Sequence, residues 1–224
     1  MESKVTVARR TFVARLAAAI GLAGVTSAVS ETALAQTPAP QRWQPTHHPE
    51  DDWYNQTTGI HRFVFDSISP DGLSAAMGFA TTFLEASKNG YGIKDADSAI
   101  IVIVRNRSTR FGYNDAMWAK YGKQFSEQLN NFVDPKTKEV PTVNIHATTD
   151  GTMDKLIKRG ARIAVCEVAT HGVASSLARS LSGDADAIFK ELSANLVPSA
   201  RLVPAGIVAV NRAQEHGYAL YAGG

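Results

Sequence analysis

The sequence predicts an α/β fold: a single doubly wound domain of about five mostly parallel strands with helices on both faces. Two observations predict it. Short runs rich in β-branched residues alternate with longer segments of helical period from Ile60 to Tyr221. Two of these runs, 99–104 and 161–168, are almost continuously apolar, which is typical of strands that are buried on both faces of a parallel sheet.

Residues 1–35 predict a cleavable export signal. A basic start that ends in Arg9-Arg10 precedes a short run of small apolar residues, and residues 33–35 form an A-x-A cleavage site. The arginine pair is similar to a twin-arginine translocation signal, and an ordinary secretory signal is the alternative. We therefore expect a periplasmic bacterial protein that starts at Gln36 and has no membrane span after the signal is removed.

The expected mature chain carries balanced charge. The signal holds four of the 23 basic and two of the 21 acidic side chains, so 19 of each remain. This balance gives no electrostatic reason to expect nucleic acid or an anionic membrane as a partner. The length that remains suits one domain with a sizeable core.

Residues 36–59 predict a proline-containing arm or linker, lying on a neighbour, ahead of the domain at 60–224. His47-His48 and the acidic run 50–52 lack the spacing of a defined metal site, so a solvated segment is favoured. Trp53 and Tyr54 indicate that part of the arm docks on an apolar surface.

The first half of the domain predicts two strands and two helices. Ser69 is placed to cap a helix that runs to about Lys88 and closes at Asn89-Gly90. The strand 99–104 is expected at the sheet centre, after a first strand at 60–65. Asn114 is expected to cap the next helix, whose apolar residues suit a packed or intersubunit face: Met117, Trp118, Tyr121 and Phe125.

The second half continues the alternation after a charged connection at 134–143. A short helix at 152–158 is expected to lead into the strand 161–168. The elements expected after that strand are helices from about 170 to 181 and from 184, a strand at 201–203, a helix from 204 to 214 and a strand at 218–221.

Cys166 is the only cysteine, so no internal disulfide forms and the expected exported chain carries a free thiol. It lies near the end of a predicted parallel strand, at the sheet edge where ligands bind, and a following helix N-terminus favours the thiolate. Arg105 and Asn106 end the central strand, and Thr170 and His171 open the next helix. These four are candidates to stabilise the thiolate or bind a ligand.

Each candidate also has a structural interpretation. Cys166 is equally typical of a buried strand residue, Arg105 of a surface ion pair and His171 of a solvated helix position. The sequence contains no G-x-G-x-x-G, P-loop or G-x-S-x-G motif, so nucleotide binding and serine-hydrolase chemistry have no support. No metal or organic cofactor is implied, since one cysteine with scattered histidines is a poor ligand set.

The stretch A-R-I-A-V-C-E-V-A-T-H-G, followed by A-R-L-V-P-A-G-I-V-A-V-N-R-A-Q-E-H-G-Y-A, resembles the DsrE/DsrF-like family, also called YchN-like. The segment F-G-Y-N-D-A-M-W-A-K-Y is similar to that of exported members. The resemblance implies a five-stranded parallel α/β fold that assembles into trimers or hexamers. It also implies a sulfur relay, in which a cysteine at the position of Cys166 carries a persulfide between donor and acceptor proteins.

The leading hypothesis is an exported, homo-oligomeric sulfur carrier that works through Cys166. A second hypothesis is a non-catalytic binding or assembly module, in which Cys166 is core and the aromatic helix around Trp118 and Tyr121 holds an oligomer or a small ligand. A third is haem or metal binding through Cys166 and a histidine. Accessibility of the thiol separates the first two.

Overall fold

The sheet contains five strands, and every neighbouring pair is parallel. The computed structural model describes residues 44–148 and 151–223, so the expected signal peptide and the start of the arm lie outside the described residues. The strand order is β4-β3-β2-β1-β5, which places β2 at the centre and confirms the predicted α/β class. The strands are β1 (His61–Ser67), β2 (Ser98–Val104), β3 (Arg162–Cys166), β4 (Ala200–Val203) and β5 (Ala219–Gly223).

Helices connect each strand to the next, as right-handed crossovers require. The α-helices are α1 (Asp52–Asn55), α2 (Pro70–Tyr91), α3 (Asp115–Gln128), α4 (Thr152–Lys158), α5 (Glu167–Leu181), α6 (Ala185–Ala194) and α7 (Gly206–Glu215). Short 3₁₀ turns occur at η1 (Pro49–Asp51), η2 (Asp95–Asp97) and η3 (Asn106–Gly112).

The predicted helix starts are confirmed by their caps. The Ser69 side chain accepts a hydrogen bond from the Gly72 amide at 2.9 Å, and Asn114 accepts one from the Met117 amide at 3.3 Å. The predicted stop of the first helix is wrong. α2 continues through Gly90 and ends where Gly92 adopts a left-handed φ of 69°.

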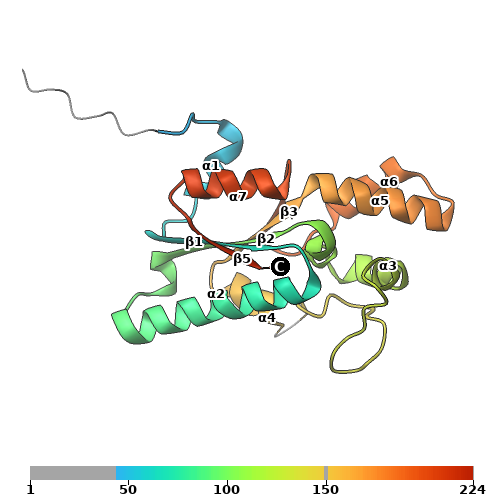
Figure 1. Ribbon diagram of the computed structural model, residues 1–224, viewed down its shortest axis with the longest axis horizontal. Helices are drawn as coiled ribbons and strands as arrows, with labels where there is room; N and C mark the ends of the chain where they lie inside the picture. Colours follow the sequence, from blue (N-terminus) through green and yellow to red (C-terminus); the bar gives the residue numbers. More distant parts are fainter. Residues whose placement is uncertain (1–43, 149–150, 224) are drawn as a thin grey trace, which may run out of the picture. The chain divides into compact units, whose positions relative to one another are not determined.

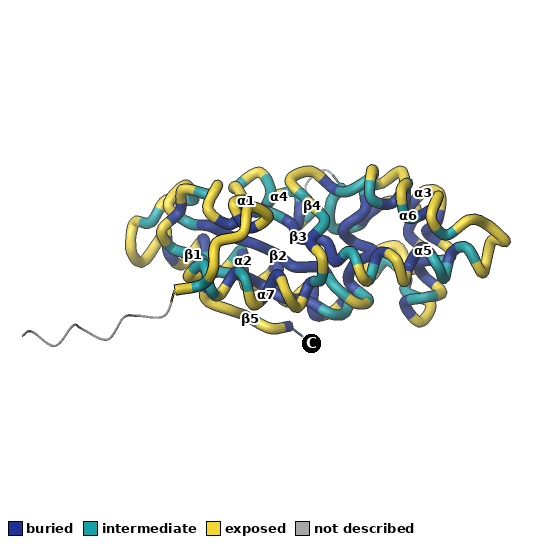
Figure 2. The backbone as a smooth tube through the Cα atoms, turned by 90° about the horizontal axis from the view of Figure 1, so that it is seen from above, coloured by how far each residue is buried: buried dark blue, intermediate teal, exposed yellow. Residues whose placement is uncertain are grey.

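The sheet has two unlike faces. One, which we call the five-helix face, packs against α2, α3, α4, α5 and α6 in one large apolar cluster. The other, the α7 face, packs against α7 and α1 in a smaller cluster. Figure 1 shows α7 with α1 on one side of the strands and α2 with α4 on the other, and Figure 2 shows β2 and β3 buried between the layers.

The described part of the arm packs against the α/β domain of the same chain. Trp53 and Tyr54 are 4% and 2% exposed and pack in the cluster of the α7 face. Their predicted docking on an apolar surface is confirmed, but that surface is α7 and the sheet of the same chain. The physical reason is that one helix alone leaves this face of the sheet incompletely covered.

The aromatic residues of α3 lie in the core. Trp118 is fully buried, Tyr121 is 3% exposed, and both belong to the cluster of the five-helix face. The Trp118 indole donates a hydrogen bond to the Arg110 carbonyl oxygen at 3.1 Å. Of the two predicted alternatives, a packed or an intersubunit face, the packed one is therefore observed, and η3 supplies part of the surface against which Trp118 packs.

The connections change side between β3 and β4. Those that follow β1, β2 and β3 run in one direction along the sheet and place their helices on the five-helix face. The connection after β4 returns across the sheet to β5 and places α7 on the opposite face. Adjacent strands β3 and β4 therefore send the chain to opposite faces at their carboxyl ends, which is the place where open α/β sheets form a ligand crevice.

Candidate functional site

Cys166 lies at this change of side. It is the last residue of β3 and the N-cap of α5, and its Sγ accepts a hydrogen bond from the Ala169 amide at 3.4 Å. Only 6% of the residue is exposed. A backbone N–H group and the positive end of a helix are surroundings that favour negative charge on the sulfur atom.

The strand is shorter and the helix longer than predicted. β3 stops at Cys166, and α5 begins at Glu167 instead of near Thr170. Thr170 is fully buried, and its hydroxyl donates to the Cys166 carbonyl oxygen at 2.9 Å. The capping sulfur and this hydroxyl both tie the first turn of α5 to the end of the strand, so the apolar residues after Cys166 continue as helix.

The Cys166 side chain lies on the α7 face of the sheet. Side chains alternate along a strand, and Ala164, two residues earlier, packs in the cluster of that face. Val203, the register partner of Cys166 in β4, belongs to the same cluster. The thiol is therefore on the side of the sheet that carries α7 and the arm.

Arg105 lies on the same face, but a carboxylate holds it. Its Nε donates to Asp66 Oδ1 at 2.9 Å, and its Nη2 donates to Oδ2 at 2.7 Å. The hydrogen bonds to Asp66 raise the pKa of Arg105, and the negative charges of Asp66 and of the Cys166 thiolate act in the same direction. Asp66 therefore largely compensates the guanidinium charge of Arg105.

The start of α7 lies against this pair. A Cβ atom added to Gly206 would lie 2.6 Å from the Arg105 Cβ, so only glycine permits the approach. The carboxyl end of β2 thus meets the first turn of α7 through Arg105, which Asp66 of β1 holds in place.

A serine network fixes the turn after β2. The Ser108 hydroxyl accepts from the Arg105 amide at 3.0 Å and lies 2.9 Å from the Ser67 carbonyl oxygen, and the Ser67 hydroxyl donates to the Ile103 carbonyl oxygen at 2.8 Å. Asn106 is exposed and adopts a left-handed φ of 56°, which asparagine tolerates well. Asn106 thus turns the chain so that Arg105 points along the α7 face. No sequence motif indicates this role of Ser108.

The structure does not bring His171 to the thiol. Its ring stacks on Phe189 of α6 with centroids 3.7 Å apart, and its Nε2 lies 3.9 Å from Glu167. Among the described residues, no hydrogen bond joins the candidate His171 to Cys166. Tyr113, which sequence reasoning missed, donates from its hydroxyl to Thr170 at 3.0 Å, and burial raises the pKa of Tyr113.

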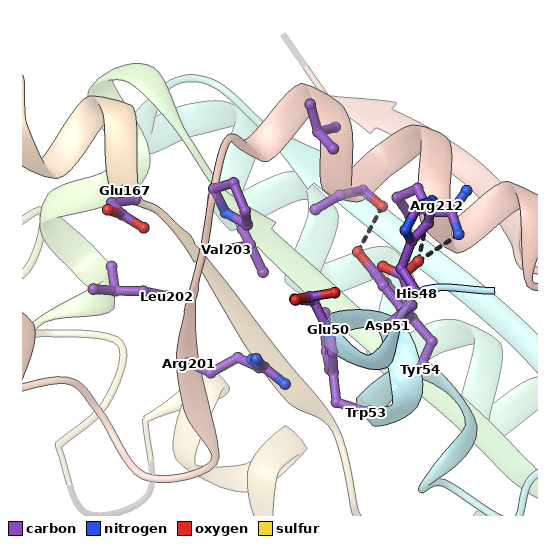
Figure 3. A pocket seen from close by; sticks show the side chains of 13 residues that line it. His48, Glu50, Asp51, Trp53, Tyr54, Glu167, Arg201, Leu202, Val203 and Arg212 are labelled. Carbon is purple, nitrogen blue, oxygen red and sulfur yellow. Dashed lines mark hydrogen bonds and ion pairs between the residues drawn. The ribbon is translucent and has the colours of Figure 1, made fainter. Parts of the chain in front are cut away.

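A cavity of about 460 Å³ opens on the α7 face beside β4. Figure 3 shows Arg201, Leu202 and Val203 on one side of it and the arm residues Glu50 and Trp53 on the other. Glu167, which directly follows Cys166, also lines it. The cavity therefore adjoins the strand end that carries the thiol.

In the parts of the chain that the structure describes, no three histidine, cysteine, aspartate or glutamate side chains group as metal ligands. No described helix is both long and apolar enough to cross a membrane.

No family model matches the chain, and no curated protein matches it at a significant level. A solved structure of a protein of unknown function from Methanobacterium thermoautotrophicum is similar, with 13% identity and a TM-score of 0.36. The alignment covers 72% of this chain and 98% of that one. A likeness at this level carries no argument about function.

Proposed function

We propose that the protein is a sulfur carrier in which Cys166 accepts sulfane sulfur as a persulfide. The observation that carries the proposal is the position of the only cysteine: its sulfur caps α5 on the α7 face, at the change of side between β3 and β4. Parallel α/β sheets bind their ligands at this place. The sequence resemblance to the DsrE/DsrF-like family supports the same role.

The chemistry needs only the thiolate and a donor. The Cys166 thiolate attacks the outer sulfur of a persulfide R–S–SH, a new S–S bond forms, and the donor S–S bond breaks. The donor leaves as the thiolate R–S⁻, and Cys166 holds S–SH. Transfer to an acceptor thiolate reverses these roles, so no external oxidant or reductant is consumed.

The surroundings suit this exchange. The Ala169 amide donates a hydrogen bond to the sulfur at the N-terminus of α5, and the Asp66–Arg105 pair lies on the same face of the sheet. We extend the proposal to the cell: the protein acts in the periplasm as a homo-oligomer, a trimer or a hexamer, and exchanges sulfur with a partner protein. The export signal and the family resemblance support these additions.

The second candidate is a binding module in which Cys166 serves only as the cap of α5. The exposure of 6% favours it, because a nucleophile has to meet its donor. In that case the thiol resists modification in the folded protein.

Intact-mass spectrometry separates the two. We treat the purified protein with thiosulfate, inorganic polysulfide or an organic persulfide and expect the mass of one sulfur atom on wild type and none on Cys166→Ser. Serine is itself a strong N-cap, so this variant keeps α5 in place. A wild-type thiol that takes up no sulfur from any donor, in protein that circular dichroism shows to be folded, rejects the proposal.

A further inference from the structure

The cavity on the α7 face is preformed. The arm residue Asp51 is fixed by Arg212 of α7, whose Nε donates to Asp51 Oδ2 at 2.7 Å. The Tyr54 hydroxyl donates to the Ala209 carbonyl oxygen at 3.2 Å, and its ring stacks on His216 with centroids 5.2 Å apart. Both arm contacts are buried or nearly so, and they fix the outer wall of the cavity to α7.

Three charged groups reach the cavity without neutralising one another. Arg201 lies over the Trp53 ring, 5.4 Å from its centroid, and makes no ion pair with any described residue. Glu50, on the opposite wall, also has no ion-pair partner among the residues that the structure describes. Glu167 faces only the distant Nε2 of His171. The cavity thus offers one cationic and two anionic groups.

Apolar side chains line the space between these charges. Trp53 and Val203 are among the apolar residues that line it. The volume of about 460 Å³ falls in the range of small-molecule sites, too small for a folded partner. A ligand that satisfies the lining carries an ammonium group, a carboxylate and a short apolar stem.

The cavity and Cys166 lie at the carboxyl ends of the same two neighbouring strands. Val203, which lines the cavity, is the register partner of Cys166, and Glu167 follows Cys166 directly. All of them belong to the carboxyl ends of β3 and β4. The cavity therefore adjoins the strand end that carries Cys166.

We propose that this cavity binds a small thiol or persulfide of the amino-acid type, with its carboxylate on Arg201 and its ammonium group between Glu50 and Glu167. Its sulfur then points to the end of β3. The sulfur-transfer step rests on the proposed function, whereas the binding itself does not. The donor to Cys166 is thus a small zwitterion and not only a partner protein.

Binding is tested with S-methylcysteine, a thioether that carries both charges and transfers no sulfur. Isothermal titration and the fluorescence of Trp53 in the cavity wall should both report saturable binding to the full chain. Arg201→Ala should weaken it by about tenfold, the loss of one hydrogen-bonded charge pair. Arg179→Ala removes an exposed arginine of α5 that does not line the cavity and should change nothing. No binding, or equal binding by Arg201→Ala, overturns the inference.

Transfer is tested with cysteine persulfide and with thiosulfate, which has no ammonium group. Glu50→Gln should slow sulfur uptake from cysteine persulfide by about tenfold and leave uptake from thiosulfate unchanged. Glu127→Gln, on the exposed side of α3, is the matched control. If Glu50→Gln takes up sulfur from both donors as fast as wild type, the cavity is not the donor site. The proposal that Cys166 is a sulfur carrier is not affected by that result. If the protein binds S-methylcysteine but takes up sulfur from neither donor, the sulfur-carrier proposal is rejected and the proposed ligand site is retained.

Discussion

The two faces of the sheet differ in how they are covered and in the side chains they carry. The five-helix face is a continuous apolar core in which Trp118 and Phe125 are fully buried. The α7 face has a smaller core, and it also carries the thiol, the Asp66–Arg105 pair and the cavity. One helix and the docked arm cover this face, whereas five helices cover the other.

The largest effect is expected on the five-helix face. Trp118→Ala removes a fully buried ring and its hydrogen bond to the Arg110 carbonyl oxygen. We expect a loss of about 3–5 kcal/mol in the free energy of unfolding, measured by urea denaturation. A loss below about 1 kcal/mol would show that this face tolerates large cavities and would remove the contrast between the faces.

Acid should destabilise the protein mainly through a histidine on the five-helix face. Burial lowers the pKa of His146 from 6.5 to about 4, and its ring packs on Phe111. Because the unfolded chain binds the proton first, stability should be complete above pH 6.5 and fall by about 3 kcal/mol as the pH drops toward about 4.

Denaturation across this pH range measures the effect, and His146→Gln should flatten the curve. Burial also lowers the pKa of His216 on the α7 face, so His216→Gln is the comparison. A curve that only His216→Gln flattens would place the acid-sensitive contact on the α7 face instead.

Trp53→Ala should cost less than Trp118→Ala, about 1–2 kcal/mol, although both rings are buried. The arm can detach locally, which limits the loss to the energy of its own docking. Hydrogen exchange should show faster exchange at 44–57 and unchanged protection in α3. Faster exchange across the whole sheet would mean that the arm is an integral part of the core.

The smallest effects concern Cys166. Cys166→Ala removes the cap of α5 and should cost about 1 kcal/mol, whereas Cys166→Ser should be close to neutral. Thermal unfolding of both variants checks this. Equal losses for alanine and serine would show that packing of the sulfur, and not capping, is what Cys166 contributes to stability.

The sequence was sufficient to predict the strands, because runs such as Ala99–Val104 have one stable place in a parallel sheet. It predicted the edge where Cys166 and Arg105 lie, because parallel strands end together. It did not predict the pairing of Arg105 with Asp66, since their separation along the chain is 39 residues and many arginines end strands. It also missed the end of β3, because Glu167 and Val168 fit strand and helix equally in an apolar run.

The arm shows a further limit of sequence reasoning. Its prolines and charges resemble a linker, and its contacts with α7 depend on residues at the other end of the chain. Trp53 and Tyr54 were the only signal, and they indicated burial without saying against what. The cavity follows from that docking, so it could not be predicted either.

The Asp51–Arg212 contact joins residues 161 positions apart, almost the length of the domain. During synthesis β1, β2 and β3 and the helices α2 to α6 leave the ribosome before α7 and β5, and the arm has no α7 surface to dock on until α7 emerges. The docking of the arm is therefore among the last contacts to form. Until then Trp53 and Tyr54 lack the α7 surface that buries them in the finished protein, and exposed aromatic rings make the newly made chain more prone to aggregation.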